Sequence, residues 1–119
     1  MKSLSGVNRL PEERFECHDC EREFTDDEVR DTWKCPLCEA YIHIYAEDAE
    51  THTKIVLVRK AAQEIQVDDL VHLPGMLTKK PYLVLGVNQL RGQLGIGLKE
   101  YGQYKVSPDA PVNCRVGAW

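Results

Sequence analysis

Two closely spaced pairs of cysteines constrain the fold of this chain more than any other feature. Cys17 and Cys20 form the first pair, Cys35 and Cys38 form the second, and fourteen residues separate the pairs. A gap of two residues lets a tight turn direct both sulfur atoms of a pair at one ion, and two such pairs complete a tetrahedral four-thiolate site. The spacing therefore predicts a Zn²⁺ site formed by all four cysteines.

The same cysteines could pair as disulfides, which is the pattern of small secreted domains. Residues 1–6 lack the apolar stretch of a secretory signal, and the sequence contains no run of about 18 apolar residues that would span a membrane. We therefore expect a cytoplasmic protein with reduced thiols, a bound metal and no membrane partner.

The residues around the cysteines resemble a zinc ribbon. An aromatic residue precedes each pair, Phe15 before the first and Trp33 before the second, and Pro36 gives the second pair the sequence Cys-Pro-Leu-Cys. The resemblance covers residues 14–45. It implies three short antiparallel strands around one zinc ion, the last of them over residues 41–45.

Rubredoxins hold iron in a similar four-thiolate cage and would make this half an electron carrier. In both families glycine usually follows the second cysteine of each pair, where φ is positive, but this chain has Glu21 and Glu39 there. The missing glycines and the attached second half favour zinc. A site closed by four sulfurs has no open position for water, which implies a structural metal. Because four cysteines suffice, His18 and His43 are not expected to be ligands.

Charge and composition divide the chain near residue 50. Residues 1–50 contain 6 Lys and Arg against 14 Asp and Glu, whereas residues 51–119 contain 9 against 5, so formal charges of −8 and +4 make up the total of −4. The polar stretch 46–53 predicts a linker. We therefore expect two domains, a zinc ribbon over 1–50 with its core at 14–45, and a second domain over 51–119. Domains of this size commonly need a staple such as a metal.

The acidic stretch between the cysteine pairs predicts a helical turn. Thr25 can cap it, and Glu28 supplies the acid of a capping box. Its acidic side chains either form a solvated turn or a docking surface for a basic partner.

Short apolar runs separated by turn residues continue through the second half. They predict strands at 55–58, 71–73, 82–87, 93–99, 104–106 and 112–116, with a helical turn at 61–64. The fold class we expect is mainly β, a four-cysteine zinc ribbon followed by a small antiparallel barrel. The rhythm of residues 65–87 resembles the opening of an SH3-like barrel, and an OB-like barrel is the alternative. Cys114 alternates with Val112 and Val116, which predicts a core strand residue.

Basic and tyrosine side chains interleave in the second half. Lysines would neutralise phosphates and tyrosine rings would stack on bases, as in proteins that bind single strands. Alternatively, the lysines guard strand edges against aggregation and the tyrosines belong partly to the core. The candidate residues for binding nucleic acid or another partner are Lys79, Lys80, Tyr82, Arg91, Lys99, Tyr101, Tyr104 and Lys105.

These features favour a noncatalytic adaptor or regulator. The sequence has no glycine-rich phosphate loop, nucleophile elbow or His-Glu-x-x-His motif, so neither an enzyme nor a small-molecule substrate is expected. The acidic ribbon would bind a protein, and the basic half would bind nucleic acid or an acidic surface, on a machine that acts on nucleic acid, as in transcription. The alternatives are a rubredoxin-like electron-transfer module and a protein-binding inhibitor with an acidic face. Trp119 either packs back on the fold or anchors a partner.

Overall fold

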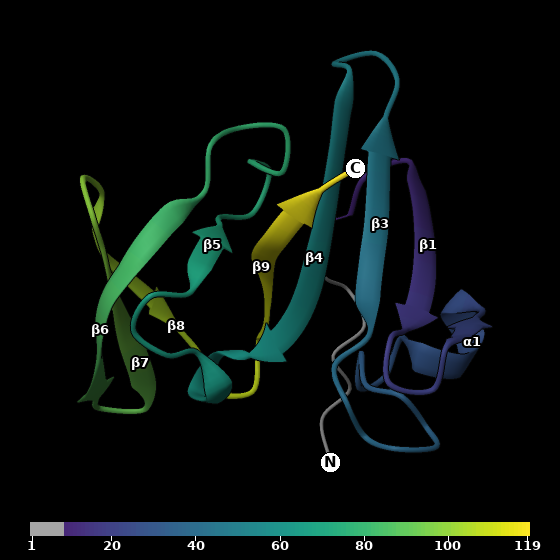
Figure 1. Ribbon diagram of the computed structural model, residues 1–119. Helices are drawn as coiled ribbons and strands as arrows, with labels where there is room; N and C mark the ends of the chain where they lie inside the picture. Colours follow the sequence, from purple (N-terminus) through teal and green to yellow (C-terminus); the bar gives the residue numbers. More distant parts are fainter. Residues whose placement is uncertain (1–8) are drawn as a thin grey trace.

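The computed structural model describes residues 9–119, whose strands form one antiparallel sheet (Figure 1). The strand order is β2-β1-β3-β4-β9-β5-β6-β7-β8. The strands are β1 (Glu12–Cys17), β2 (Arg22–Phe24), β3 (His43–Asp48), β4 (Thr53–Ala61), β5 (Leu70–His72), β6 (Tyr82–Leu90), β7 (Gln93–Leu98), β8 (Gly102–Val106) and β9 (Pro111–Ala118).

Two single helical turns interrupt the strands, α1 (Asp26–Val29) and the 3₁₀ turn η1 (Ala62–Glu64), and both were predicted. Within the part of the chain that the structure describes, no helix has the length and apolar character needed to cross a membrane. Residues 1–8, which carry the sequence argument about a secretory signal, lie outside the described residues.

The first half contains the three short antiparallel strands that the zinc-ribbon resemblance implies. Phe15 at the centre of β1 lies opposite Phe24 of β2 on one side and Ile44 of β3 on the other. Directly paired residues of neighbouring strands point to the same side of the sheet. The three side chains therefore lie on one face, where they are buried together with Trp33. The strand expected at residues 41–45 begins at His43 and extends further than predicted.

The polar segment 46–53 is a hairpin rather than the predicted linker. β3 continues to Asp48, and β4 begins at Thr53, which pairs directly with Asp48 across the turn. The backbone of β3 is hydrogen-bonded to β1 on one edge and to β4 on the other, which stabilises a strand whatever its side-chain polarity. The sheet therefore continues from the first half into the second without a break.

The second half contains the predicted antiparallel strands, but the predicted closed barrel is wrong. Over Ile55–Leu57, β4 pairs with β3 along one edge and with β9 along the other. The last strand of the order, β8, pairs with β7 alone among the described strands, so no pairing joins it back to β4. The result is an open sheet in which β6–β8 lie at the opposite end from α1 and β1 (Figure 1).

Two clusters of buried side chains meet at β4. Ile55 and Leu57 belong to the cluster of the first half, whereas Val58 belongs to that of the second half. Each half also contributes to the other cluster, because Leu77 from the loop after β5 packs in the first and Tyr41 packs against the second. The two halves thus share a strand and exchange core residues.

The alternation in β7 produces the predicted faces. Leu94, Ile96 and Leu98 are buried on one face. Gly95 faces the other way, where a Cβ atom would overlap the side chain of Gln103 on β8, so the strand uses the missing side chain for a close contact. Cys114 is buried on β9, as predicted.

Candidate functional site

The four cysteines of the predicted metal site converge at one end of the β1–β2 hairpin. Their sulfur atoms all lie within 4.8 Å of one another. The Sγ atoms of Cys17 and Cys38 are 3.5 Å apart, and those of Cys20 and Cys35 are 3.9 Å apart. Four sulfurs placed tetrahedrally at about 2.3 Å from a zinc ion lie about 3.8 Å from each other. The spacing therefore fits one ion shared by four thiolates, and all four cysteines are free of disulfides.

The residue after the second cysteine of each pair adopts the backbone conformation for which zinc ribbons and rubredoxins usually carry glycine. Glu21 has φ of 51° and Glu39 has φ of 63°, so both residues lie in the left-handed region. The backbone N–H of Cys20 lies 3.4 Å from Sγ of Cys17, and that of Leu37 lies 3.3 Å from Sγ of Cys35. The missing glycines therefore do not change the shape of the turns, and glutamate takes up the conformation at a cost in strain.

The helical turn α1 lies between the two cysteine pairs and helps to bring the second pair back to the first. The Thr25 N–H donates to the carboxylate of Glu28, which caps the turn, and the Trp33 N–H donates to the carbonyl of Val29 at 2.6 Å. Trp33 is fully buried, and its ring centroid lies 5.7 Å from that of Phe15. The two aromatic residues that precede the cysteine pairs thus pack on each other and hold the pairs together.

Hydrogen bonds within the protein favour deprotonation of Cys35. Burial raises the pKa of Cys35, but hydrogen bonds from the backbone N–H groups of Cys38 and Leu37 outweigh it and lower the pKa to about 7. A hydrogen bond with Cys38, together with burial, raises the pKa of Cys20 to about 12. A divalent cation would displace the remaining thiol protons on binding, so its affinity depends on pH.

The histidines near the cysteines make other contacts. His18 stacks on His43 with ring centroids 3.7 Å apart, and its Nε2 lies 2.9 Å from the Tyr45 hydroxyl. Among the described residues, the group that could hold a metal ion consists of the four cysteines. The donor set is therefore all sulfur, which fits zinc or iron.

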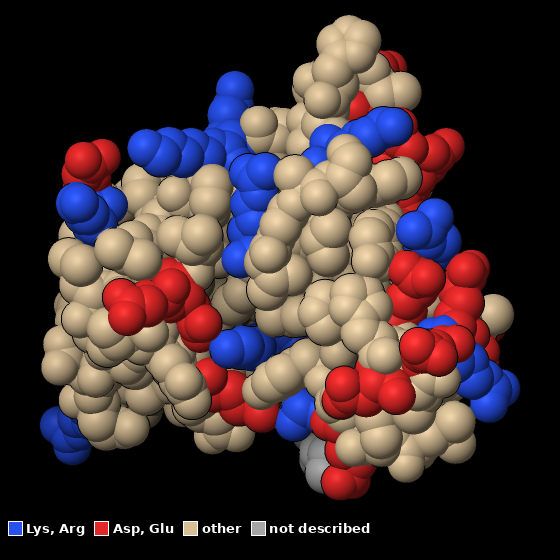
Figure 2. Space-filling view, in the orientation of Figure 1, with Lys and Arg blue, Asp and Glu red and all other residues tan. Residues whose placement is uncertain are grey.

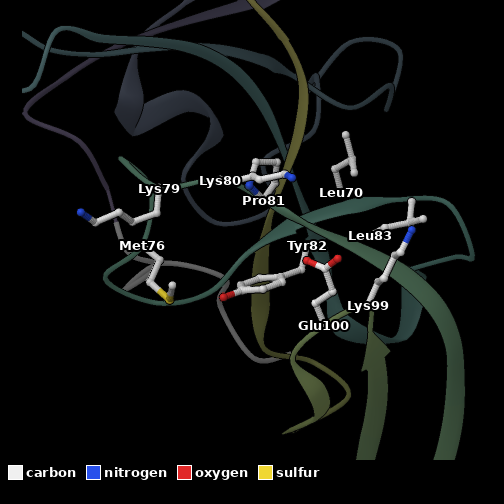
Figure 3. A pocket seen from close by; sticks show the side chains of 9 residues that line it. All are labelled: Leu70, Met76, Lys79, Lys80, Pro81, Tyr82, Leu83, Lys99 and Glu100. Atoms are coloured by element: carbon white, nitrogen blue, oxygen red, sulfur yellow. The ribbon is translucent and has the colours of Figure 1, made fainter.

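The eight candidate binding residues of the second half are divided by the fold. Lys79, Lys80, Tyr82 and Lys99 line a single hollow of about 580 Å³ (Figure 3), and Tyr101 packs on Tyr82 with ring centroids 5.3 Å apart. The remaining three lie outside the hollow, Arg91 in the turn between β6 and β7, and Tyr104 and Lys105 on β8.

Several residues of this hollow were not expected from the sequence. We call it the lysine-rimmed pocket, and its lining residues are Leu70, Met76, Lys79, Lys80, Pro81, Tyr82, Leu83, Lys99 and Glu100. One feature of the sequence could have indicated this pocket. Leu83 and Leu85 flank the buried Val84 in β6, so the strand carries apolar side chains on both faces, although one face is not covered by the core.

Acidic side chains gather most densely at one end of the molecule, although Figure 2 also shows acidic groups over the other end. The end around α1 is mostly acidic, whereas lysines lie over the loop that joins β5 to β6. Some of the acids are paired: Asp26 contacts Arg9 and Arg30, and Asp27 also contacts Arg30, although the side chain of Asp27 remains 80% exposed. The acidic half of the sequence therefore forms the mostly acidic end of the fold, whereas the second half carries charges of both signs.

Trp119 packs back on the first half of the fold. Its ring lies edge-on to Tyr45 with centroids 5.8 Å apart, and the Arg14 guanidinium lies 5.5 Å from its centroid. The residue is nevertheless 44% exposed.

Comparison with protein-family models, with curated proteins and with solved structures finds no match for this chain.

Proposed function

We propose that this chain is a noncatalytic adaptor in which a structural Zn²⁺ ion, bound by Cys17, Cys20, Cys35 and Cys38, shapes the first half. The convergence of the four sulfur atoms carries the proposal. The ion would tie the end of β1 to the turn that follows it and to the segment before β3, and its binding free energy would contribute directly to folding. A reducing compartment such as the cytoplasm would keep the thiols available.

The division of charge supports two different contacts. The acidic end around α1 is complementary to a basic surface of a protein partner, whereas the lysines of the second half are complementary to nucleic acid or to an acidic surface. Because both ends belong to one continuous sheet, an adaptor of this kind would hold its two partners at a fixed separation. A machine that acts on nucleic acid is the setting we propose.

Metal removal tests the structural role of the ion. We expect a chelator to abolish the dispersed amide NMR signals of residues 14–45 in the 119-residue chain, together with capture of the partner from the native cell, because binding of the ion contributes to the folding free energy. The double variant Cys35→Ser, Cys38→Ser should behave like the chelated protein. Cys114→Ser is the matched control, since this buried cysteine lies outside the cluster. A ribbon that keeps its signals without metal would contradict the proposal.

Metal analysis separates this proposal from electron transfer. Protein produced with both zinc and iron available should contain one zinc ion per chain. Stoichiometric iron with visible thiolate-to-iron absorption would instead favour a rubredoxin-like module, because the same four sulfurs accept either ion.

A further inference from the structure

We infer that the lysine-rimmed pocket is the docking site for an acidic segment of a partner protein that carries an apolar anchor side chain. The inference rests on the proposed role of the second half as the binding site for an anionic partner. It deepens that role by choosing between the two classes of partner, an acidic protein and a nucleic acid.

The floor of the pocket is apolar: Leu70 and Leu83 come from the outer face of the β5–β6 pair, whereas Tyr82 and Met76 also pack against the buried cluster of the second half. Leu70 of β5 pairs directly with Leu83 of β6, while their neighbours Val71 and Val84 are fully buried on the inner face. Figure 3 shows Leu83 beside Lys99 on one side of the pocket, with Tyr82 facing Met76 on the other. A hollow of about 580 Å³ with this lining has the size and character of an anchor pocket.

Apolar exposure extends beyond the floor. Leu70 is 37% exposed, and Leu85, two residues beyond Leu83 on the same strand, is 58% exposed. Tyr101, which packs on Tyr82, is 51% exposed. Exposed apolar side chains gathered at one place and surrounded by charged groups typically mark a protein interaction surface.

The rim supplies the charge that selects an acidic partner. Lys79, Lys80 and Lys99 form no ion pair with any residue of 9–119, whereas Lys34, Lys54 and Lys60 each pair with an acid. Glu100 is the one acid among the lining residues. The pocket therefore presents an excess of positive charge without internal partners, which favours carboxylates placed on either side of an anchor.

Nucleic acid fits the same lining less well. A base needs the open face of an aromatic ring, but Tyr82 is half-buried against Tyr101, and the rest of the floor is aliphatic. A strand of phosphates needs cations along a track. Arg91 and Lys105, which would extend such a track, lie outside the pocket.

Selection from a random dodecapeptide library displayed on phage tests the inference, with the zinc-loaded 119-residue chain as the target. The double variant Lys79→Gln, Lys99→Gln lacks two positive charges of the rim. It is used for counter-selection, which removes the phage that bind this variant as well. We expect the selected peptides to carry Asp or Glu on both sides of a Leu, Ile, Phe or Trp. Their affinity for the double variant, measured by fluorescence anisotropy, should be lower by about tenfold.

The control variant Arg91→Gln, Lys105→Gln removes the same charge from exposed positions outside the pocket. It should change the affinity by less than about twofold, since only distant screened charges are lost. A selected peptide should also lose its affinity when its anchor is replaced by serine. An equal loss for the two double variants, or no effect of the anchor, would overturn the inference.

Random 12-nucleotide RNA and DNA libraries, tested at the same salt concentration, provide the competing probe. Tighter binding of either library than of the selected peptides, lost in the rim variant, would assign the pocket to nucleic acid and overturn the inference. That result would leave the adaptor proposal intact. Loss of the ribbon signals on chelation concerns the adaptor proposal alone, so the two can fail separately.

Discussion

Arg59 on β4 and Glu13 on β1 form a buried ion pair between strands that are not neighbours in the sheet. Their side chains are 0% and 3% exposed, and both terminal nitrogens of the guanidinium donate to the carboxylate. Nε of Arg59 donates to Oδ1 of Asn113 on β9 at 2.7 Å, and the guanidinium lies 4.5 Å from the ring centroid of Trp33. This pair thus connects the metal-binding half to the second half of the sheet.

Removal of one member of this pair should destabilise the protein strongly. Glu13→Gln removes the carboxylate that both terminal nitrogens of the buried Arg59 guanidinium contact and that also pairs with Arg9, so we expect the free energy of unfolding to fall by about 3–5 kcal/mol. Urea denaturation of the zinc-loaded protein measures the change. The double variant Glu13→Leu, Arg59→Met removes both charges and should recover part of the loss.

Lys54→Met is the control for this prediction. It breaks the exposed contact between Lys54 and Glu47, whose closest atoms are 3.9 Å apart, and should have a much smaller effect. If Glu13→Gln proves no more destabilising than Lys54→Met, the buried pair does not hold the halves together.

Glycine in place of the glutamate that follows each cysteine pair should stabilise the protein. Glu21 and Glu39 have positive φ, which costs free energy for any residue with a Cβ atom. We expect Glu21→Gly and Glu39→Gly each to raise the free energy of unfolding by up to about 1 kcal/mol, since relief of strain exceeds the extra flexibility of the unfolded chain.

Glu23→Gly in β2 is the matched control, because it makes the same chemical change at a position without positive φ. This variant should destabilise the protein, as glycine does within strands. Destabilisation by Glu21→Gly equal to that of Glu23→Gly would show that glutamate is not strained in the turn.

The stability of the protein should fall between neutral and mildly acidic pH in part because of His72. Burial lowers the pKa of this histidine, which is 3% exposed and whose Nδ1 lies 3.1 Å from the carbonyl of Met76. The unfolded chain therefore binds more protons than the folded protein between the lowered pKa and the ordinary value of about 6.5. The contribution of His72 to the free energy of unfolding is complete above that ordinary value, and it is lost as the pH falls toward the lowered pKa.

Urea denaturation of the wild-type protein and of His72→Gln across this pH range measures the effect. Burial also lowers the pKa of His43, so some slope should remain in the variant. The slope of unfolding free energy against pH should be smaller in His72→Gln than in the wild type. Equal slopes would show that His72 does not take part.

Local patterns identified much of the structure from the sequence. The ligand spacing is read within a few residues of each turn, so all four cysteines could be named, and the turn at Thr25 follows from its capping residues. Strands of the second half were also recognised from local alternation. Even the departure at Glu21 and Glu39 was informative, because it marked positions whose φ proved positive.

What the sequence did not reveal depends on pairing between distant residues. Arg59 lies 46 residues from Glu13 and 54 from Asn113, and nothing local to it indicates a buried partner. Whether β8 pairs back to β4 and closes a barrel depends on pairing between strands distant in the sequence, which local alternation does not encode. Lys99 joins the pocket because its backbone N–H pairs with the carbonyl of Leu83.

X-ray absorption spectroscopy at the zinc edge, on the 119-residue chain purified under reducing conditions, tests the central claim most directly. We expect one zinc per chain with four sulfur neighbours at about 2.3 Å and no nitrogen or oxygen in the first shell. A coordination shell containing nitrogen or oxygen, or a purified protein whose cysteines are joined as disulfides and hold no metal, would contradict the account.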